Sequence, residues 1–159
     1  MSFDDWMLAL HVLSAFSLVA GVVFFWVVIV AARQTDTAEG TLRFGPLTRV
    51  ADSSIGLGMG GTIVLGIWLA FSVGDYDIWD GWIIAALVLW VVTAAIGQRT
   101  SAAYAPAVRK AQELQAAGQT GPDPELGALN RTSRGVLLQV LASVVVLLIL
   151  LDMIWKPGA

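Results

Sequence analysis

Few side chains in this sequence can carry chemistry. The chain of 159 residues has one histidine, His11, and no cysteine. Without cysteine there can be no disulfide, no thiolate metal site and no covalently attached c-type haem. His11 lies near the start of a long apolar segment, where an ionisable group is a functional candidate by default. The chemistry open to its imidazole is the binding of haem iron or the transfer of a proton.

Two further polar residues can accompany His11. At 1.5 Å per residue, His11 lies about 7–8 Å from one end of its apolar segment. Asp152 lies about 4–5 Å from the end of the last apolar segment, so the two match in depth if both ends meet the same membrane surface. A His11–Asp152 pair would satisfy both polar groups, and Ser14 would complete a small polar pocket. The alternative is that His11 only hydrogen-bonds to a neighbouring helix near the membrane interface.

A haem site at His11 needs further ligands. Haem iron in a membrane electron carrier usually takes two axial ligands, most often His or Met. Met59 would lie about 15 Å from His11 in depth, in a hydrocarbon core of about 30 Å. A haem b would therefore be five-coordinate or bridge the His11 residues of two copies. No metal site is predicted.

The composition fixes the class of protein that must position these residues. Apolar residues make up 57% of the chain and charged residues 13%, and the mean hydropathy is +0.77. A soluble domain of this length cannot bury so large an apolar excess. The composition excludes a soluble enzyme, a disordered tail and a nucleic-acid binder. It predicts one polytopic membrane domain over residues 1–159, with the lipid bilayer as its surroundings.

Apolar segments long enough to cross a membrane predict an all-α protein, a bundle of four transmembrane helices. The predicted helices cover residues 6–32, 54–73, 81–117 and 124–155. The last two include extensions beyond the membrane, which form a helical hairpin that Pro106 should kink. Gly118 is the predicted C-cap of one arm, and Asp123-Pro-Glu125 begins the other. A short amphipathic helix is also predicted within 39–52, and Gly45-Pro46 should break it.

The basic residues predict the orientation of the chain. Eight of them fall in or beside the segments after the first and third helices, and one, Lys156, follows the fourth. Because cytoplasmic loops carry the excess of Lys and Arg, we expect both termini outside and loops 33–53 and 97–133 in the cytoplasm. Aromatic residues should then mark the outer boundary of the membrane. These are Trp6, Tyr76, Trp79, Trp82 and Trp155.

Small residues in the second span predict close helix packing. Gly56 and Gly60 form a Gly-x-x-x-Gly pair, and Gly66 adds a third small site. Small residues let helix backbones approach each other in lipid. The same run contains a G-x-G-x-x-G pattern, but no strand precedes it, so a dinucleotide site is rejected.

The order of several short motifs resembles a bacterial integral membrane family catalogued as domain of unknown function 2269. The motifs are Leu10-His-Val-Leu13, Phe44-Gly-Pro46, Gly66-Ile-Trp-Leu69, an acidic loop with Trp79 and Trp82, and Trp155-Lys-Pro157. The family has no established activity. It is distantly similar to four-helix membrane proteins of the copper-resistance-D and protoporphyrinogen-oxidase type, in which an early histidine matters. The resemblance implies a bacterial inner-membrane protein and points to His11.

These observations favour a protein that is not an enzyme. The first hypothesis is a homo-oligomer or an accessory subunit of a membrane complex. The alternative is a b-type haem-binding or quinone-linked redox protein that uses His11. A weaker alternative is a small-molecule permease with a pocket lined by His11, Ser14 and Asp152.

Overall fold

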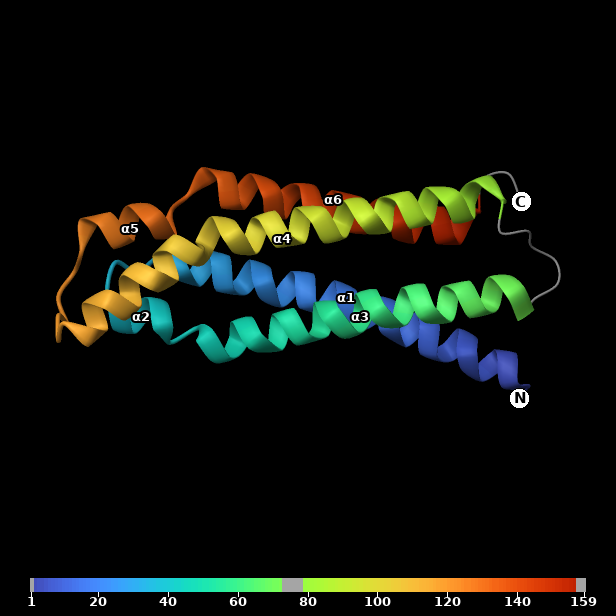
Figure 1. The fold of residues 1–159 in the computed structure, drawn as a ribbon, viewed down its shortest axis with the longest axis horizontal. Coiled ribbons are helices and arrows are strands. Elements are labelled where there is room, and N and C mark those ends of the chain that lie inside the picture. The colour runs from blue at the N-terminus through green and yellow to red at the C-terminus, as the bar shows by residue number, and fades with distance from the viewer. Residues whose placement is uncertain (1, 73–78, 157–159) are drawn as a thin grey trace.

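The computed structural model describes residues 2–72 and 79–156, and every regular element in these ranges is a helix (Figure 1). The helices are α1 (Phe3–Ala32), α2 (Ala38–Leu42), α3 (Gly45–Ser72), α4 (Gly81–Ala116), α5 (Pro124–Asn130) and α6 (Ser133–Trp155). Four helices, α1, α3, α4 and α6, are long and apolar enough to cross a membrane, in the last case together with α5. The predicted all-α class and the number of spans are therefore confirmed.

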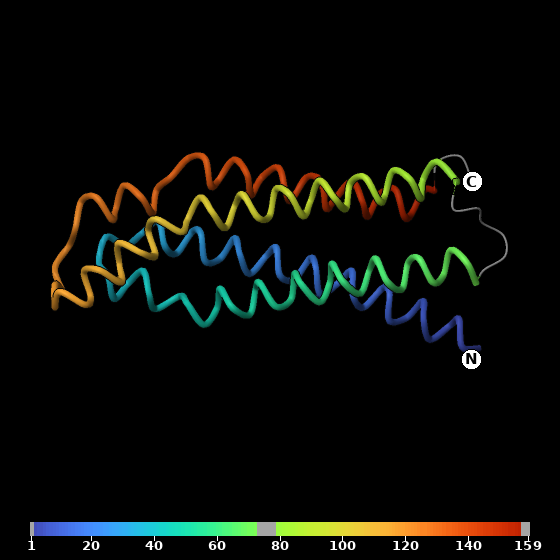
Figure 2. Tube along the Cα trace, viewed as in Figure 1, coloured from blue at the N-terminus to red at the C-terminus, as the bar shows by residue number. Residues whose placement is uncertain are grey.

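The long helices form two pairs, α1 with α3 and α4 with α6 (Figures 1 and 2). The beginning of α1 and the end of α6 lie at one end of the bundle, which we call the terminal end. The opposite end, which we call the connector end, holds α2, α5 and the last turns of α4. Exposed apolar side chains cover the long helices, as a lipid-facing surface requires.

Small residues set the distance between the helices of each pair. In the first pair, Gly58 lies against the backbone of Leu18, and Gly21 lies against Ala51 and Ile55. In the second pair, Gly135 of α6 lies against the ring of Tyr104 of α4. A side chain at any of these glycines would overlap its neighbour, so their absence of Cβ permits the close approach.

Hydrogen bonds from buried side chains join the two pairs. Trp26 Nε1 of α1 donates to Ser143 Oγ of α6 at 2.9 Å, and Gln139 Nε2 of α6 donates to the carbonyl of Val22 at 3.3 Å. Trp90 Nε1 of α4 donates to the carbonyl of Met59 in α3 at 3.0 Å. Polar groups within a bilayer must find partners inside the protein, so these bonds fix how the pairs face each other.

The connector end has a small core of its own. Leu126 and Ala111 are fully buried there, and Ala38 and Ala107 pack against them. The side-chain amide of Asn130 donates to the carbonyl of Thr35 at 3.1 Å and to Thr41 Oγ1 at 2.9 Å. Gly118 follows α4 with a φ of 70°, the left-handed conformation that glycine accepts most easily. The hairpin is thus packed against α2.

Two predicted boundaries in this region were wrong. The second spanning helix begins at Gly45 instead of residue 54, because Pro46 lies in its first turn, where the missing N–H costs nothing. Gly45-Pro46 therefore starts a helix, and the short helix before it, α2, ends at Leu42. The arm predicted as one helix over 124–155 is divided into α5 and α6 at Arg131 and Thr132. Thr132 has an extended backbone there, with a ψ of 121°.

Pro106 lies inside α4, as the sequence implied. The last third of α4, drawn in yellow and orange, bends toward α2 in Figure 1. Proline has no N–H for the carbonyl four residues earlier, so a bend there has a physical cause.

Candidate functional site

His11 lies on the face of α1 that packs against α3. Its ring is half-buried. If residue 66 had a Cβ atom, this atom would lie 3.0 Å from Cε1 of the ring. Gly66 therefore makes room for the imidazole. The Nδ1 atom is buried and has no hydrogen-bond partner among the described residues. An unpaired nitrogen inside a bilayer is costly, which makes His11 a candidate for binding a proton or a ligand.

Ser14 is one turn from His11 in α1, and like His11 it contacts α3. Its hydroxyl donates to the carbonyl of Leu10 at 2.8 Å, and its side chain packs against Gly61 of α3. A serine bonded to its own helix in this way satisfies its hydroxyl locally. His11 and Ser14 thus lie side by side on the α1–α3 contact.

Asp152 belongs to the other helix pair. It lies near the end of α6, and its Oδ2 atom is buried without a hydrogen-bond partner in the described part of the chain. Within residues 2–72 and 79–156, neither a hydrogen bond nor an ion pair joins Asp152 to His11. The bonds between α1 and α6 come from Trp26 and Gln139, and Trp26 lies about 22 Å along α1 from His11.

Of the three glycines predicted to pack against other helices, Gly56, Gly60 and Gly66, only Gly66 does so within one chain. Gly66 contacts His11, but a Cβ at Gly56 or Gly60 would have no heavy atom within 4 Å. The contacts to α1 come instead from Gly58 and Gly61. In a helix of 3.6 residues per turn, positions 56 and 60 share one face, and positions 58 and 61 share another. The glycines at 56 and 60 face away from the molecule.

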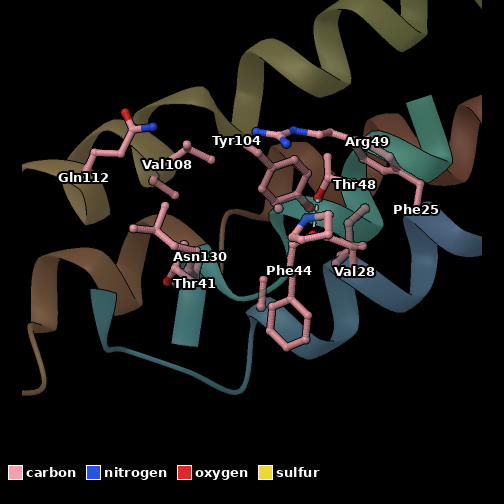
Figure 3. A pocket seen from close by; sticks show the side chains of 16 residues that line it. Phe25, Val28, Thr41, Phe44, Thr48, Arg49, Tyr104, Val108, Gln112 and Asn130 are labelled. Carbon is pink, nitrogen blue, oxygen red and sulfur yellow. Dashed lines mark hydrogen bonds between the residues drawn. The ribbon is translucent and has the colours of Figure 1, made fainter. Parts of the chain in front are cut away.

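A cavity at the connector end was not found from the sequence. It has a volume of about 430 Å³ and lies between α1, α2, α3, α4 and the end of α5. Figure 3 shows Phe25, Val28 and Phe44 on one side and Val108, Gln112 and Asn130 on the other. Arg49 and Tyr104 also line it. The sequence feature that could have indicated it is the cluster of arginines beside Gly45-Pro46, which by itself predicts only the orientation of the chain.

The aromatic residues predicted at one membrane boundary lie at the terminal end wherever they are described. Trp82 near the start of α4 lies 5.4 Å from Lys156 Nζ at the end of α6. Phe3 at the start of α1 makes an edge-to-face contact with Trp68 near the end of α3, with ring centroids 5.9 Å apart. Tyr76 and most of the predicted acidic loop lie outside the described residues.

Comparison with known proteins identifies a family. A model of the family described as "Predicted integral membrane protein (DUF2269)" matches residues 6–157. No curated protein and no solved structure matches the chain.

Proposed function

The chain belongs to the DUF2269 family of predicted integral membrane proteins, and from this premise we propose that it acts as a homo-oligomer without catalytic activity of its own. The proposed place is the bacterial inner membrane, with both termini outside. The second copy binds along one face of α3. We call this face the open stripe and define it by Gly56, Gly60, Val64, Ile67 and Phe71.

The observation that carries the proposal is the pair of exposed glycines at the beginning of this stripe. Many exposed positions of the other spans carry bulky groups, such as Phe16 and Leu13 of α1, which are 68% and 63% exposed. Lipid offers no hydrophobic reason for glycine at its boundary, whereas a second helix gains close backbone contact there. Glycine also costs about 0.8–1 kcal/mol of helix propensity relative to Ala.

A groove on the same face supports a protein partner. It is a hollow of about 470 Å³ lined by Val64, Ile67, Trp68, Phe71 and Ser72. It begins one turn beyond Gly60, so a helix that crosses at the glycines can place bulky side chains in it. The same face of a second copy offers both the small residues and the bulky ones, which is the requirement of a two-fold symmetric contact.

The oligomer can be tested with matched glycine variants. Gly97 of α4 also has open space around it, so Gly97→Leu is the control for Gly60→Leu. We expect wild-type protein and Gly97→Leu to have the mass of a dimer in mild detergent, and Gly60→Leu that of a monomer. A wild-type monomer in every mild detergent, or a Gly60→Leu variant as dimeric as its control, would refute the proposal.

Cysteine crosslinking tests the same contact in the membrane. The natural chain has no cysteine, so a single introduced thiol reports one position. We expect Gly56→Cys to form a disulfide-linked dimer on mild oxidation and Gly97→Cys to remain monomeric. Equal crosslinking of the two variants would show random collision and would contradict the proposed face.

A second candidate function rests on the half-buried imidazole of His11 inside an apolar helix. Its Nδ1 is buried toward Gly66, so haem iron would bind the other ring nitrogen, Nε2, which would make the protein a b-type haem or quinone-linked redox protein. The test is the visible spectrum of the purified protein. A Soret band that His11→Ala removes and Ser14→Ala keeps would support haem binding, and a wild-type spectrum without the band would exclude it.

A further inference from the structure

We propose that the cavity at the connector end binds one anionic phospholipid, with an acyl chain between the two helix pairs and the phosphate at Arg49. This site is separate from the open stripe, which lies further along α3. The inference does not depend on the proposed homo-oligomer.

The walls of the cavity suit a hydrocarbon chain. Phe25 and Val28 of α1 and Phe44 before α3 form one side, and Val108 of α4 lies on the other (Figure 3). The volume of about 430 Å³ falls within the range of about 300–1,000 Å³ that is typical of small-molecule sites. The walls come from both helix pairs, so a bound chain would lie between them and contact each.

Among the polar residues that line the cavity, Arg49 is the cation that can bind a headgroup. The Asn130 amide is used by Thr35 and Thr41, and the Thr48 hydroxyl donates to the carbonyl of Phe44 at 3.0 Å. Arg49 is exposed, and its side chain forms neither an ion pair nor a hydrogen bond with the described part of the chain. Its guanidinium can therefore form a bidentate contact with a phosphate.

The charge of the connector end favours an anionic headgroup. Residues 33–53 and 97–134 contain eight Lys and Arg residues against six Asp and Glu residues. One acidic residue, Glu125, is already paired with Lys110 at 2.5 Å. At the terminal end the balance is reversed, because Asp4, Asp5, Asp80 and Asp152 face only Lys156 among the described residues. Anionic lipid is therefore expected at the connector end alone.

The test is native mass spectrometry of the full chain released from mild detergent after incubation with one lipid at a time. The probes are palmitoyl-oleoyl phosphatidylglycerol and its zwitterionic phosphatidylcholine counterpart, which share the same acyl chains. We expect one phosphatidylglycerol per chain to be retained. Arg49→Gln should weaken its binding roughly fivefold, the effect of one cation near an anionic lipid surface.

Two matched controls make the result specific to the cavity. Arg109→Gln removes an exposed arginine of α4 that does not line the cavity, and it should bind as the wild type does. Val108→Trp fills the cavity from α4, whereas Ala102→Trp places the same side chain at an exposed position outside it. We expect the first tryptophan to abolish retention of the lipid and the second to leave it unchanged.

Three outcomes would overturn the proposal. The first is equal retention of phosphatidylglycerol by Arg49→Gln and Arg109→Gln, which would place the lipid on the general basic surface. The second is equal retention by Val108→Trp and Ala102→Trp, provided that both variants keep the wild-type helical circular dichroism. The third is retention of neither lipid by the wild type, including the case in which a second copy of the chain fills the cavity instead.

Discussion

At the scale of single residues, glycines decide how closely α1 and α3 approach. Gly58 is buried, and a Cβ there would overlap the backbone nitrogen and Cα of Leu18. Backbone atoms cannot move aside as the end of a long side chain can. The contact between α1 and α3 therefore tolerates no larger residue at position 58. A methyl group added at a glycine with open space around it would contact no other atom.

We predict that Gly58→Ala destabilises the protein by about 1–3 kcal/mol, the usual cost of overpacking. Gly97→Ala is the matched control and should be neutral or slightly stabilising, because alanine favours a helix. The measurement is unfolding by sodium dodecyl sulfate in mixed micelles, followed by circular dichroism. Equal stability of the two variants would contradict the described contact.

The sequence could predict that small residues matter in this helix, but not which of them. Glycines at 56 and 60 lie on one face of α3, and glycines at 58 and 61 lie on a nearly opposite face. Which face of α3 packs against α1 depends on the contacts that Ser14 and Leu18 of α1 make with Gly61 and Gly58. A single sequence does not show these pairings. The same reason applies to His11, whose proximity to Gly66 is a property of the packed pair.

At the scale of elements, the two helix pairs are joined by side-chain hydrogen bonds and by a small apolar core, in which Val146 of α6 packs with Leu18 of α1 and Met59 of α3. Trp26 with Ser143, Gln139 with Val22, and Trp90 with Met59 connect helices that belong to different pairs. Lipid gives no hydrophobic drive for these contacts, so the hydrogen bonds and the packing around them set the relative position of the pairs.

We predict a coupling energy of about 0.6 kcal/mol, and at most about 1.7, between Trp26 and Ser143, as for other hydrogen bonds in membrane proteins. The measurement is a double-mutant cycle with Trp26→Phe and Ser143→Ala. Replacing Ser143→Ala with Ser101→Ala, a change at an exposed position of α4, gives a control cycle. The hydrogen bond would be in doubt if the two cycles gave the same coupling.

The number of spans was predictable, because an apolar run of about 20 residues has few alternatives in a membrane protein. The division between α5 and α6 was not predictable in the same way. It depends on Asn130, whose amide is held by Thr35 and Thr41 on distant parts of the chain. The cavity at the connector end likewise depends on contacts between five helices, which hydropathy does not describe.

At the scale of the whole molecule, charge is separated along the bundle. Eight basic residues lie between the middle of the bundle and the connector end, and Lys156 lies at the terminal end. The fold brings α2, α5 and the bent part of α4 to the same end. The orientation predicted from the sequence can therefore be tested at two defined ends of one bundle.

We predict that the terminal end faces outward and the connector end faces the cytoplasm. In spheroplasts, an impermeant maleimide should label Trp79→Cys at once and Gln119→Cys only after lysis. Both positions are exposed, and the cysteine-free natural chain provides the unlabelled control. Immediate labelling of Gln119→Cys with protection of Trp79→Cys would reverse the orientation.

The pairing of α1 with α3 and of α4 with α6 has a consequence for biosynthesis. Each span packs mainly against a span next to it in the chain, so the first pair can form before α4 has entered the membrane. The face of α3 with Gly56 and Gly60 is then already in the membrane while the ribosome is still at work. If the proposed homo-oligomer forms through this face, chains made on the same messenger could meet there, and assembly would begin during translation, between neighbouring nascent proteins.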